Sequence, residues 1–388
     1  MHRTSSLPIS FVFVLAIVVL VAAKTFAADK PAAVAFKIEP SAIELTGRLN
    51  RLQLQVTDSS SERVNDLTRR VKYTVEPASV LAIDSAGRLQ PLTDGDATVV
   101  VTHGGETVRV PAKVSGFKKA TTNFARDIIP ILSKTGCNQG ACHASQYGKG
   151  EFKLSLFGYA PEQDHPQFVR DWHQRRVSFV APASSLILKK ATLQVSHGGG
   201  QRFKVGSFEY DQMLDWLKAG APGTTKSDPH VAGMSISPEQ RVYAEGDSQQ
   251  LRVVATYDDG STRDVSHLAL YDSMGEGVAT VDRHGLITAV GPGQAAVMVR
   301  FQGQAKVSMA MLPHRTDADL SDFVVQNFID EAVQEHWQKL GVIPADLCSD
   351  EVFIRRAFLD SIGTLPDRKK VEAFLASDKP DKREQLVD

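Results

Sequence analysis

Two cysteines and a histidine lie close together in this 388-residue chain. They are Cys137, Cys142 and His143, and the chain has only one further thiol, Cys348. A thiol can add to a vinyl group of haem, and a histidine beside the second thiol can place its imidazole under the iron. The usual spacing for this chemistry is Cys-x-x-Cys-His, whereas residues 138–141 make the present loop longer. We expect one covalently attached haem c, with both thiols as anchors and His143 as the proximal ligand.

Such a haem needs a second axial ligand or an open face. The candidates nearby are His165, His173, His197 and Met213. His197 precedes three glycines, which let backbone approach a flat ligand closely. Met213 belongs to an apolar helical face, and His165 and His173 lie in a polar stretch that should face solvent. We predict His197 as the distal ligand, with a vacant or water-held position as the alternative.

Two other interpretations of the cysteine loop stay open. In an oxidising compartment Cys137 and Cys142 could close a small disulfide, with His143 an ordinary surface residue. A zinc site is the weaker alternative, because no second pair of ligands follows at a suitable spacing.

The N-terminus has the pattern of a secretory signal. An unbroken apolar run extends from Phe11 to Ala23 and is followed by small residues that suit cleavage near Ala27. The run is too short to span a bilayer as a helix, although an uncleaved anchor is the alternative. We predict a signal peptide over residues 1–27 and export to the periplasm or the cell surface.

Charge and length limit the remaining function classes. The chain has 44 basic and 45 acidic residues and shows no basic stripe, so nucleic acid is not an expected partner. It is too long for one ordinary core, which predicts several domains. Three cysteines cannot form a disulfide framework, so the domains must be stabilised by apolar cores.

Two segments of the chain repeat each other. Residues 80–101 and 278–299 match at a constant offset of 198 residues, pairing Asp84 with Asp282, Gly87 with Gly285, Gly95 with Gly293, and Ala97 with Ala295. So long an offset indicates a duplicated domain with another domain inserted between the copies. Short β-branched runs and turn signals predict an all-β sandwich for each copy, over residues 33–115 and 229–313.

The second copy carries the more specific motifs. Residues 255–262 read Ala-Thr-Tyr-Asp-Asp-Gly-Ser-Thr, and the turn at Asp282–Gly285 is followed by Gly-x-Ala-x-Val from Gly293. These motifs resemble the bacterial Ig-like domains of group 2, which implies a spacer or adhesive module. The first copy lacks the Tyr-Asp-Asp-Gly segment.

The inserted segment, residues 116–225, has helical periodicity. Phe124, Ile128 and Leu132 share one face, and a second helix is expected after Ser207, closed by Gly220. Helices before the cysteine loop and at the domain end are typical of an all-α cytochrome c-like fold. Residues 124–132 and 152–159, together with the cysteine loop, resemble the exported, cytochrome-bearing multidomain proteins of planctomycetes. That resemblance implies a haem domain and Ig-like modules preceding a domain of unknown function.

The last segment is expected to be helical. Apolar stripes run through residues 328–340, 353–362 and 371–375, and residues 353–366 resemble the opening of that domain of unknown function. The segment 320–388 is short for the core that these stripes imply, so we expect a truncated domain.

Together these patterns predict a multidomain fold, in which two all-β sandwiches flank an all-α haem domain and a truncated helical domain follows. The main predicted function is electron transfer with an unknown redox partner. One alternative is a surface or glycan-binding Ig-like adhesion or scaffold protein with a disulfide-closed middle domain. The other is the N-terminal part of a polysaccharide-active enzyme. No carboxylate pair or Ser-His-Asp order predicts a catalytic site here, so enzymatic activity is uncertain and no catalytic residue is assigned.

Overall fold

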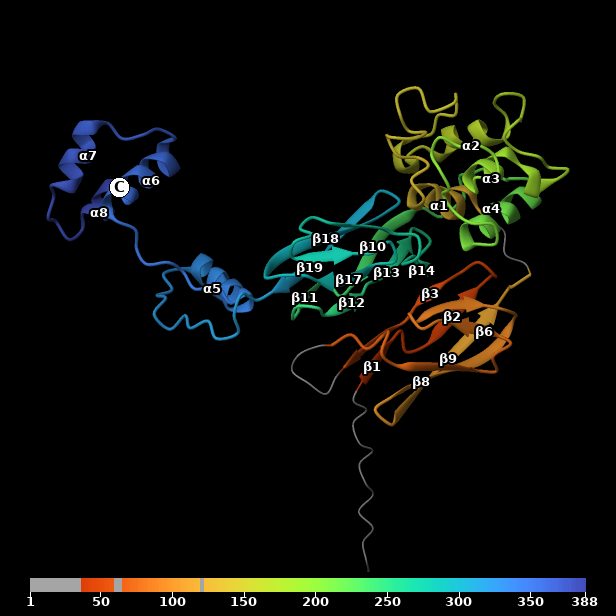
Figure 1. Cartoon of the computed structure of the whole chain (residues 1–388), viewed down its shortest axis with the longest axis horizontal. Coiled ribbons are helices and arrows are strands. Elements are labelled where there is room, and N and C mark those ends of the chain that lie inside the picture. The colour runs from red at the N-terminus through yellow and green to blue at the C-terminus, as the bar shows by residue number, and fades with distance from the viewer. Residues whose placement is uncertain (1–35, 59–64, 119–121) are drawn as a thin grey trace, which may run out of the picture.

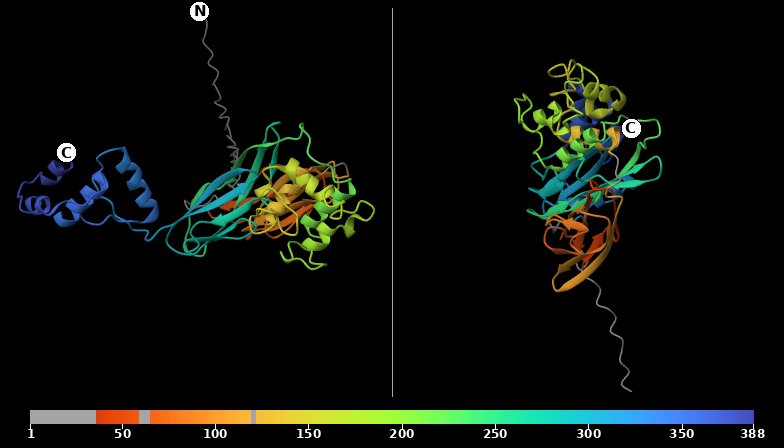
Figure 2. Two further views of the ribbon diagram at one scale, coloured as in Figure 1. Left: turned by 90° about the horizontal axis from the view of Figure 1, so that it is seen from above. Right: turned by 90° about the vertical axis from the view of Figure 1, so that its right-hand side faces the viewer.

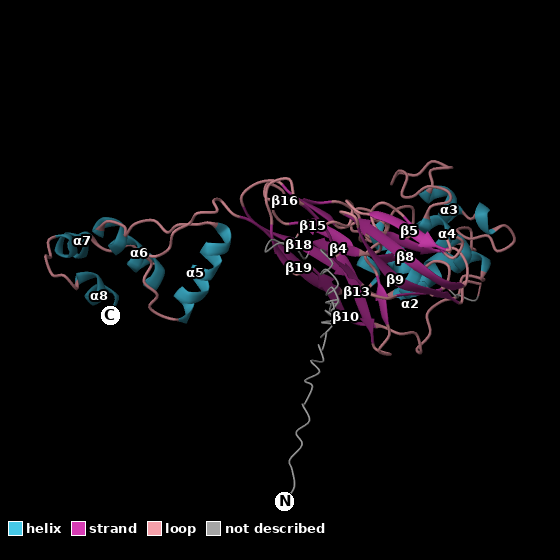
Figure 3. Cartoon of the chain, turned by 90° about the horizontal axis from the view of Figure 1, so that it is seen from below, coloured by secondary structure: helices cyan, strands magenta, loops and turns pink. Residues whose placement is uncertain are grey.

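The computed structural model describes residues 36–58, 65–118 and 122–388. The predicted signal peptide lies outside these residues. Two β-domains lie side by side, a segment of short helices packs at one end of the pair, and the C-terminal helices extend away from the other end (Figure 1). Seen from above, the C-terminal helices again extend away from the β-domains and the short helices (Figure 2, left). In space, the β-strands lie between the C-terminal helices and the short helices of the middle segment (Figure 3).

The first β-domain contains three small sheets with strand orders β2-β9-β8-β5, β3-β7-β6 and β1-β4. Its long hairpin β8–β9 places Val99, Val101, Val110 and Val114 in the core, as expected of strands with one face on a core. The strands are β1 (Phe36–Glu39), β2 (Ile43–Thr46), β3 (Leu52–Gln53), β4 (Gln55–Asp58), β5 (Lys72–Glu76), β6 (Leu81–Ile83), β7 (Arg88–Pro91), β8 (Gly95–His103) and β9 (Glu106–Ser115).

The second β-domain has the same plan, with strand orders β11-β19-β18-β15, β12-β17-β16 and β10-β13-β14. In both domains one edge strand pairs in parallel, β2 with β9 and β11 with β19. The strands are β10 (Val231–Ser237), β11 (Gln240–Val242), β12 (Ser248–Gln250), β13 (Arg252–Tyr257), β14 (Thr262–Asp264), β15 (Leu270–Ser273), β16 (Ala279–Val281), β17 (Leu286–Ala289), β18 (Gly293–Phe301) and β19 (Gln304–Leu312).

The sequence repeat is therefore also a repeat of structure. Tyr73 donates a hydrogen bond to the carbonyl of Thr68 at 2.7 Å, and Tyr271 donates to the carbonyl of Ser266 at 2.8 Å. Each tyrosine lies against the glycine of its Asp-x-x-Gly turn. A Cβ on Gly285 would come within 2.7 Å of the Tyr271 ring, and the φ of +80° also favours glycine there.

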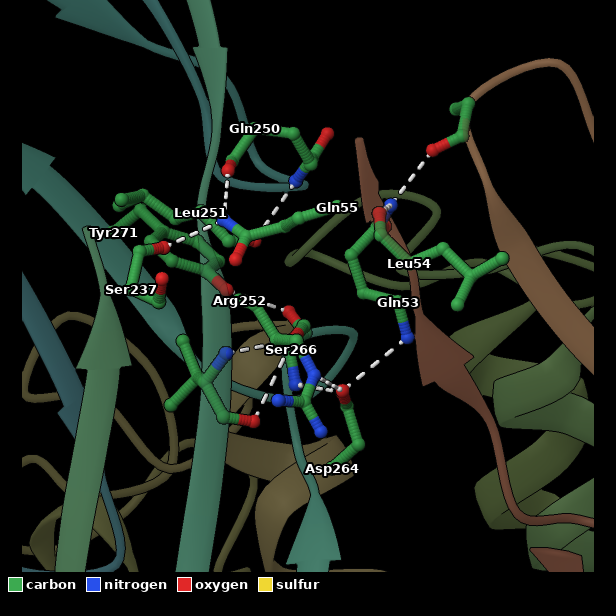
Figure 4. A network of polar contacts seen from close by, with 12 residues as sticks. Gln53, Leu54, Gln55, Ser237, Gln250, Leu251, Arg252, Asp264, Ser266 and Tyr271 are labelled. Carbon is green, nitrogen blue, oxygen red and sulfur yellow. Dashed lines mark hydrogen bonds and ion pairs between the residues drawn. The ribbon is translucent and has the colours of Figure 1, made fainter. Parts of the chain in front are cut away.

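The two β-domains contact each other through a reciprocal exchange of polar groups, and Figure 4 shows the half in which Gln53 meets Asp264. The backbone N–H of Gln53 donates to Asp264 at 3.2 Å, and that of Gln250 donates to Asp66 at 2.5 Å. Gln53 and Gln250 occupy equivalent places in their domains. Each donates its side-chain amide to the carbonyl of the residue before the glycine of the Asp-x-x-Gly turn, which is Ala86 for Gln53 and His284 for Gln250. In each domain, therefore, the aspartate accepts a hydrogen bond from the backbone N–H of the equivalent glutamine in the other domain.

The middle segment shows that the predicted fold class is wrong. Residues 122–225 do not form an all-α cytochrome-like domain, because the helices are short and joined by long turns, and no group of metal-binding side chains converges within the described residues. The elements are a π-helical turn (Phe124–Ile128), α1 (Ile129–Lys134), a 3-10 turn (Leu156–Gly158), α2 (Pro161–Val169), a second 3-10 turn (Pro182–Ser184), α3 (Leu186–Ala191) and α4 (Phe208–Lys218).

Local chemistry explains why the first predicted helix is not continuous. Pro130 cannot donate a backbone hydrogen bond, and a proline fits best in the first turn of an α-helix, where that donor would have no partner within the helix. Accordingly α1 begins at Ile129 with Pro130 in its first turn, and the preceding Phe124–Ile128 forms a wider turn capped by Asn123. The helix predicted after Ser207 is present, and Ser207 caps it by accepting from the Tyr210 N–H.

The middle segment packs firmly against the second β-domain. Asp127 and Arg263 form an ion pair at 2.6 Å, and both side chains are nearly inaccessible to solvent. Lys134 at the end of α1 donates to the carbonyls of Ala269 and Arg283 and lies 4.8 Å from the Tyr271 ring centroid. Apolar side chains of the two regions belong to one continuous core.

The C-terminal region is helical, as predicted. Its helices are α5 (Phe328–Leu340), α6 (Asp350–Ile362), α7 (Arg368–Leu375) and α8 (Lys382–Val387). Gly341 and Gly363 end α5 and α6 in the left-handed conformation. Many apolar side chains of this region are exposed, including Phe328 and Leu347, so its stripes lack a full core.

Candidate functional site

The cysteine loop begins directly after α1. Backbone hydrogen bonds fold it back on itself, because the His143 N–H donates to the Cys137 carbonyl at 3.0 Å and the Leu154 N–H donates to the His143 carbonyl at 2.8 Å. The loop borders a cavity of ≈ 490 Å³ that is also lined by Phe152, Phe168 and Met213.

The two histidines predicted as ligands face each other in this cavity. Their ring centroids are 6.3 Å apart and the ring planes differ by 11°. His143 Nδ1 lies 2.9 Å from the Phe152 carbonyl oxygen, and His197 Nδ1 lies 2.8 Å from that of Gly200. These bonds fix both rings through Nδ1. Desolvation is the main cause that lowers the pKa of His143, although its bond to the Phe152 carbonyl opposes that shift.

The thiols line the same cavity but have different surroundings. Burial raises the pKa of the Cys137 thiol, whose sulfur lies 3.3 Å from the Thr135 hydroxyl. Cys142 accepts a hydrogen bond from Arg202 at 3.2 Å. Both are free thiols, as is Cys348, so the disulfide considered between Cys137 and Cys142 is not formed. Sequence reasoning gave Arg202 no role, because a single arginine 60 residues after Cys142 does not predict a contact with a thiol.

Of the three other candidates for the distal ligand, His173 and Met213 lie as the sequence predicts and His165 does not. His173 is exposed, and Met213 is buried on the inner face of α4, where it also borders the cavity. His165 is not a solvent residue: its Nε2 lies 2.8 Å from the Ala221 carbonyl oxygen and its ring packs on Phe124. The four predicted site residues Cys137, Cys142, His143 and His197 therefore share one cavity. Within the described residues, however, no three potential metal-binding side chains of the His, Cys, Asp or Glu types converge on one point.

Comparison with protein families matches two parts of the chain. Residues 230–309 match the bacterial Ig-like domain (group 2). The second β-domain is a bacterial Ig-like domain. Residues 328–388 match PSCyt2, a protein of unknown function (DUF1549), so the C-terminal helices belong to a domain of that family. The planctomycete origin and the cytochrome domain implied by the resemblance find no match, and a comparison with curated proteins gives none either.

Solved structures show only distant similarity. Domains 5–6 of the S-layer protein SbsC share 10% identity over 71% of this chain and 96% of that chain, with a TM-score of 0.28. The D00-D0 domain of intimin shares 9% identity over 71% of this chain and 96% of that chain, with a TM-score of 0.15. The chain spans 22% of the longer SbsC structure, at a TM-score of 0.20. Scores this low carry no argument about function.

These observations correct the main functional prediction. The prediction of electron transfer through a haem domain is wrong. The family match is to an Ig-like domain, and no cluster of metal-binding side chains is present among the described residues. The surface-protein alternative agrees better with the Ig-like match, although without its disulfide.

Attachment of a cofactor is a separate question and stays a prediction. If Cys137 and Cys142 carry a covalent haem, full-length protein matured with haem-attachment machinery will keep its Soret absorbance after acid-acetone extraction. Replacing Cys142 by alanine will then remove most of that colour, whereas Cys348→Ala will not. Complete loss of colour from the unmodified protein on extraction contradicts the prediction.

Proposed function

We propose that this protein is an exported scaffold or adhesion protein, whose Ig-like modules bind a glycan or protein partner at the cell surface. The bacterial Ig-like match over residues 230–309 carries this proposal. The same strand plan in the first β-domain supplies a second module of that kind.

The way the modules are joined supports a scaffold. Buried polar bonds at Asp66 and Asp264 join the two β-domains, and the Asp127–Arg263 ion pair joins the inserted segment to the second. Polar bonds inside an interface fix the relative orientation of its partners. The three parts therefore present their outer surfaces in one fixed arrangement, as a binding scaffold requires.

The location is part of the proposal. No helix among the described residues is long and apolar enough to span a membrane. The apolar run from Phe11 to Ala23 is the feature that supports export.

A shaving and binding experiment tests both parts. Protease added to intact cells of the native host should degrade the full-length protein while a cytoplasmic marker stays intact, and the purified protein should co-sediment with isolated cell envelopes. Protection from protease until lysis contradicts surface display. If the protein sediments neither with intact envelopes nor with envelopes stripped of their proteins, the binding role is contradicted. If it sediments with intact envelopes but not with stripped ones, its partner is a protein.

A further inference from the structure

A second cavity, of ≈ 380 Å³, lies where the first β-domain, the start of α4 and the second β-domain meet. Its lining combines apolar and polar side chains from all three parts, including Arg51, Ile83, Leu89, Gln90, Phe208 and His284. A concave site at a domain junction, mostly apolar with a few polar groups, is the usual form of a small-molecule site.

Arg51 is the distinctive residue of this cavity. Its Nη1 donates to the carbonyls of Arg48 and Asn50 at 3.3 and 3.0 Å, and its guanidinium carbon lies 5.0 Å from the Phe208 ring centroid. Desolvation lowers the pKa of Arg51 to about 10, against the smaller opposing influence of Asp211. The guanidinium therefore stays charged at neutral pH although it is largely removed from water.

The other charges around the cavity are already neutralised. Arg88 pairs with Asp84 at 2.7 Å, Arg283 pairs with Glu209 at 3.3 Å, and Asp264 pairs with Arg252 at 3.0 Å. In the part of the chain that the structure describes, no carboxylate lies within ion-pair distance of Arg51. A cation removed from water is costly unless an anion accompanies it.

We propose that this cavity binds a small organic carboxylate, with Arg51 as the residue that holds the anionic group. A guanidinium presents parallel N–H donors that match the two oxygens of a carboxylate. Ile83 and Phe208 would cover the apolar part of the ligand, while Gln90 and His284 offer partners for its hydroxyl groups. The proposal goes beyond a surface-binding role, because it concerns a soluble small molecule rather than the envelope.

Titration calorimetry of the full-length protein tests the site with three probes, namely glucuronate, benzoate and glucose. At least one of the two carboxylates should bind with a Kd below about 20 mM, and glucose should bind at least about tenfold more weakly. Preference for glucuronate identifies a sugar acid as the ligand source, and preference for benzoate identifies an apolar acid. Arg51→Gln should weaken carboxylate binding at least about tenfold, because it removes a charge-assisted hydrogen bond.

Three further variants complete the test. Arg109→Gln alters an exposed arginine of the same β-domain that pairs with Glu76 away from the cavity, and it should leave binding unchanged. Arg51→Lys keeps the charge and should bind more weakly than the unmodified protein but better than Arg51→Gln. Gln90 is exposed at the edge of the cavity, so Gln90→Trp should fill the cavity and abolish binding. This variant keeps the test decisive if Arg51→Gln does not fold. The proposal is overturned if neither carboxylate binds, if glucose binds equally well, or if Gln90→Trp binds as the unmodified protein does. The envelope assay is unaffected by any of these results.

Discussion

Replacing Arg263 by methionine is expected to lower the free energy of unfolding by about 3–5 kcal/mol, because it leaves the Asp127 carboxylate buried without its main partner. Burial by itself would raise the pKa of Asp127, but Arg263 and Arg126 outweigh it and hold that pKa below its ordinary value. The Asn123 N–H also donates to this carboxylate at 2.8 Å. Urea unfolding of the full-length protein at pH 7, followed by tryptophan fluorescence, measures the loss.

The exposed ion pair in the same β-domain is the matched control. Arg300 pairs with Asp272, and both side chains are largely exposed, so Arg300→Met should cost less than about 1 kcal/mol. The double variant Asp127→Asn with Arg263→Met should recover part of the loss, because it removes the stranded charge. Equal effects of Arg263→Met and Arg300→Met would show that the buried pair does not hold the inserted segment in place.

Replacing His267 by phenylalanine should remove a large part of the acid sensitivity of the protein. Both ring nitrogens of His267 are buried without a hydrogen-bond partner, and the ring packs edge-on against Phe208 at 4.9 Å between centroids. Desolvation lowers the pKa of His267 well below its usual 6.5, and the nearby cations Arg263, Arg51 and Lys134 lower it further.

The direction of the pH effect follows from where the proton binds. The unfolded chain takes up a proton on this histidine near pH 6.5, whereas the folded protein does so only at lower pH. Stability is therefore lost as the pH falls below about 6.5, by up to about 1.4 kcal/mol per pH unit. Between pH 7 and pH 5 the unmodified protein should lose about 2 kcal/mol more than His267→Phe.

The same urea titrations at pH 7, 6 and 5 measure this difference. His336 is exposed on α5, so His336→Phe is the control and should leave the pH profile unchanged. His143 and His284, whose pKa values are also lowered by desolvation, contribute to the profile of both proteins alike. Parallel profiles for the unmodified protein and His267→Phe would contradict a buried neutral histidine.

Much of the β-structure could be predicted from the sequence, because strand alternation and turn residues are local signals. The constant offset from Asp84 to Asp282 identified the repeat without any knowledge of the fold. The C-terminal helices were predicted for the same reason, since Gly341 and Gly363 end their apolar stripes. The middle segment was not, because Pro130 and the long turns broke a helical pattern that the spacing of Phe124, Ile128 and Leu132 had suggested.

The candidate sites depended on long-range contacts that no motif announces. His143 and His197 lie in one cavity, and their roles as haem ligands stay a prediction, whereas the electron-transfer function inferred from them is wrong. Arg51 and His267 gave no local signal, because an arginine after an asparagine and a histidine in an apolar run are common. Their importance comes from contacts that are distant in the chain, because Phe208 packs against both Arg51 and His267.

The reciprocal bonds between Asp66 and Gln250 and between Asp264 and Gln53 make the contact between the β-domains isologous, like that of a symmetric homodimer. In such a contact each partner uses the same face, so both faces are consumed once the pair has formed. End-to-end Ig-like arrays grow by unlike faces and have no set length. This pair is a closed unit instead: adding a third module by the same contact is geometrically excluded, and longer assemblies would have to begin from a different surface.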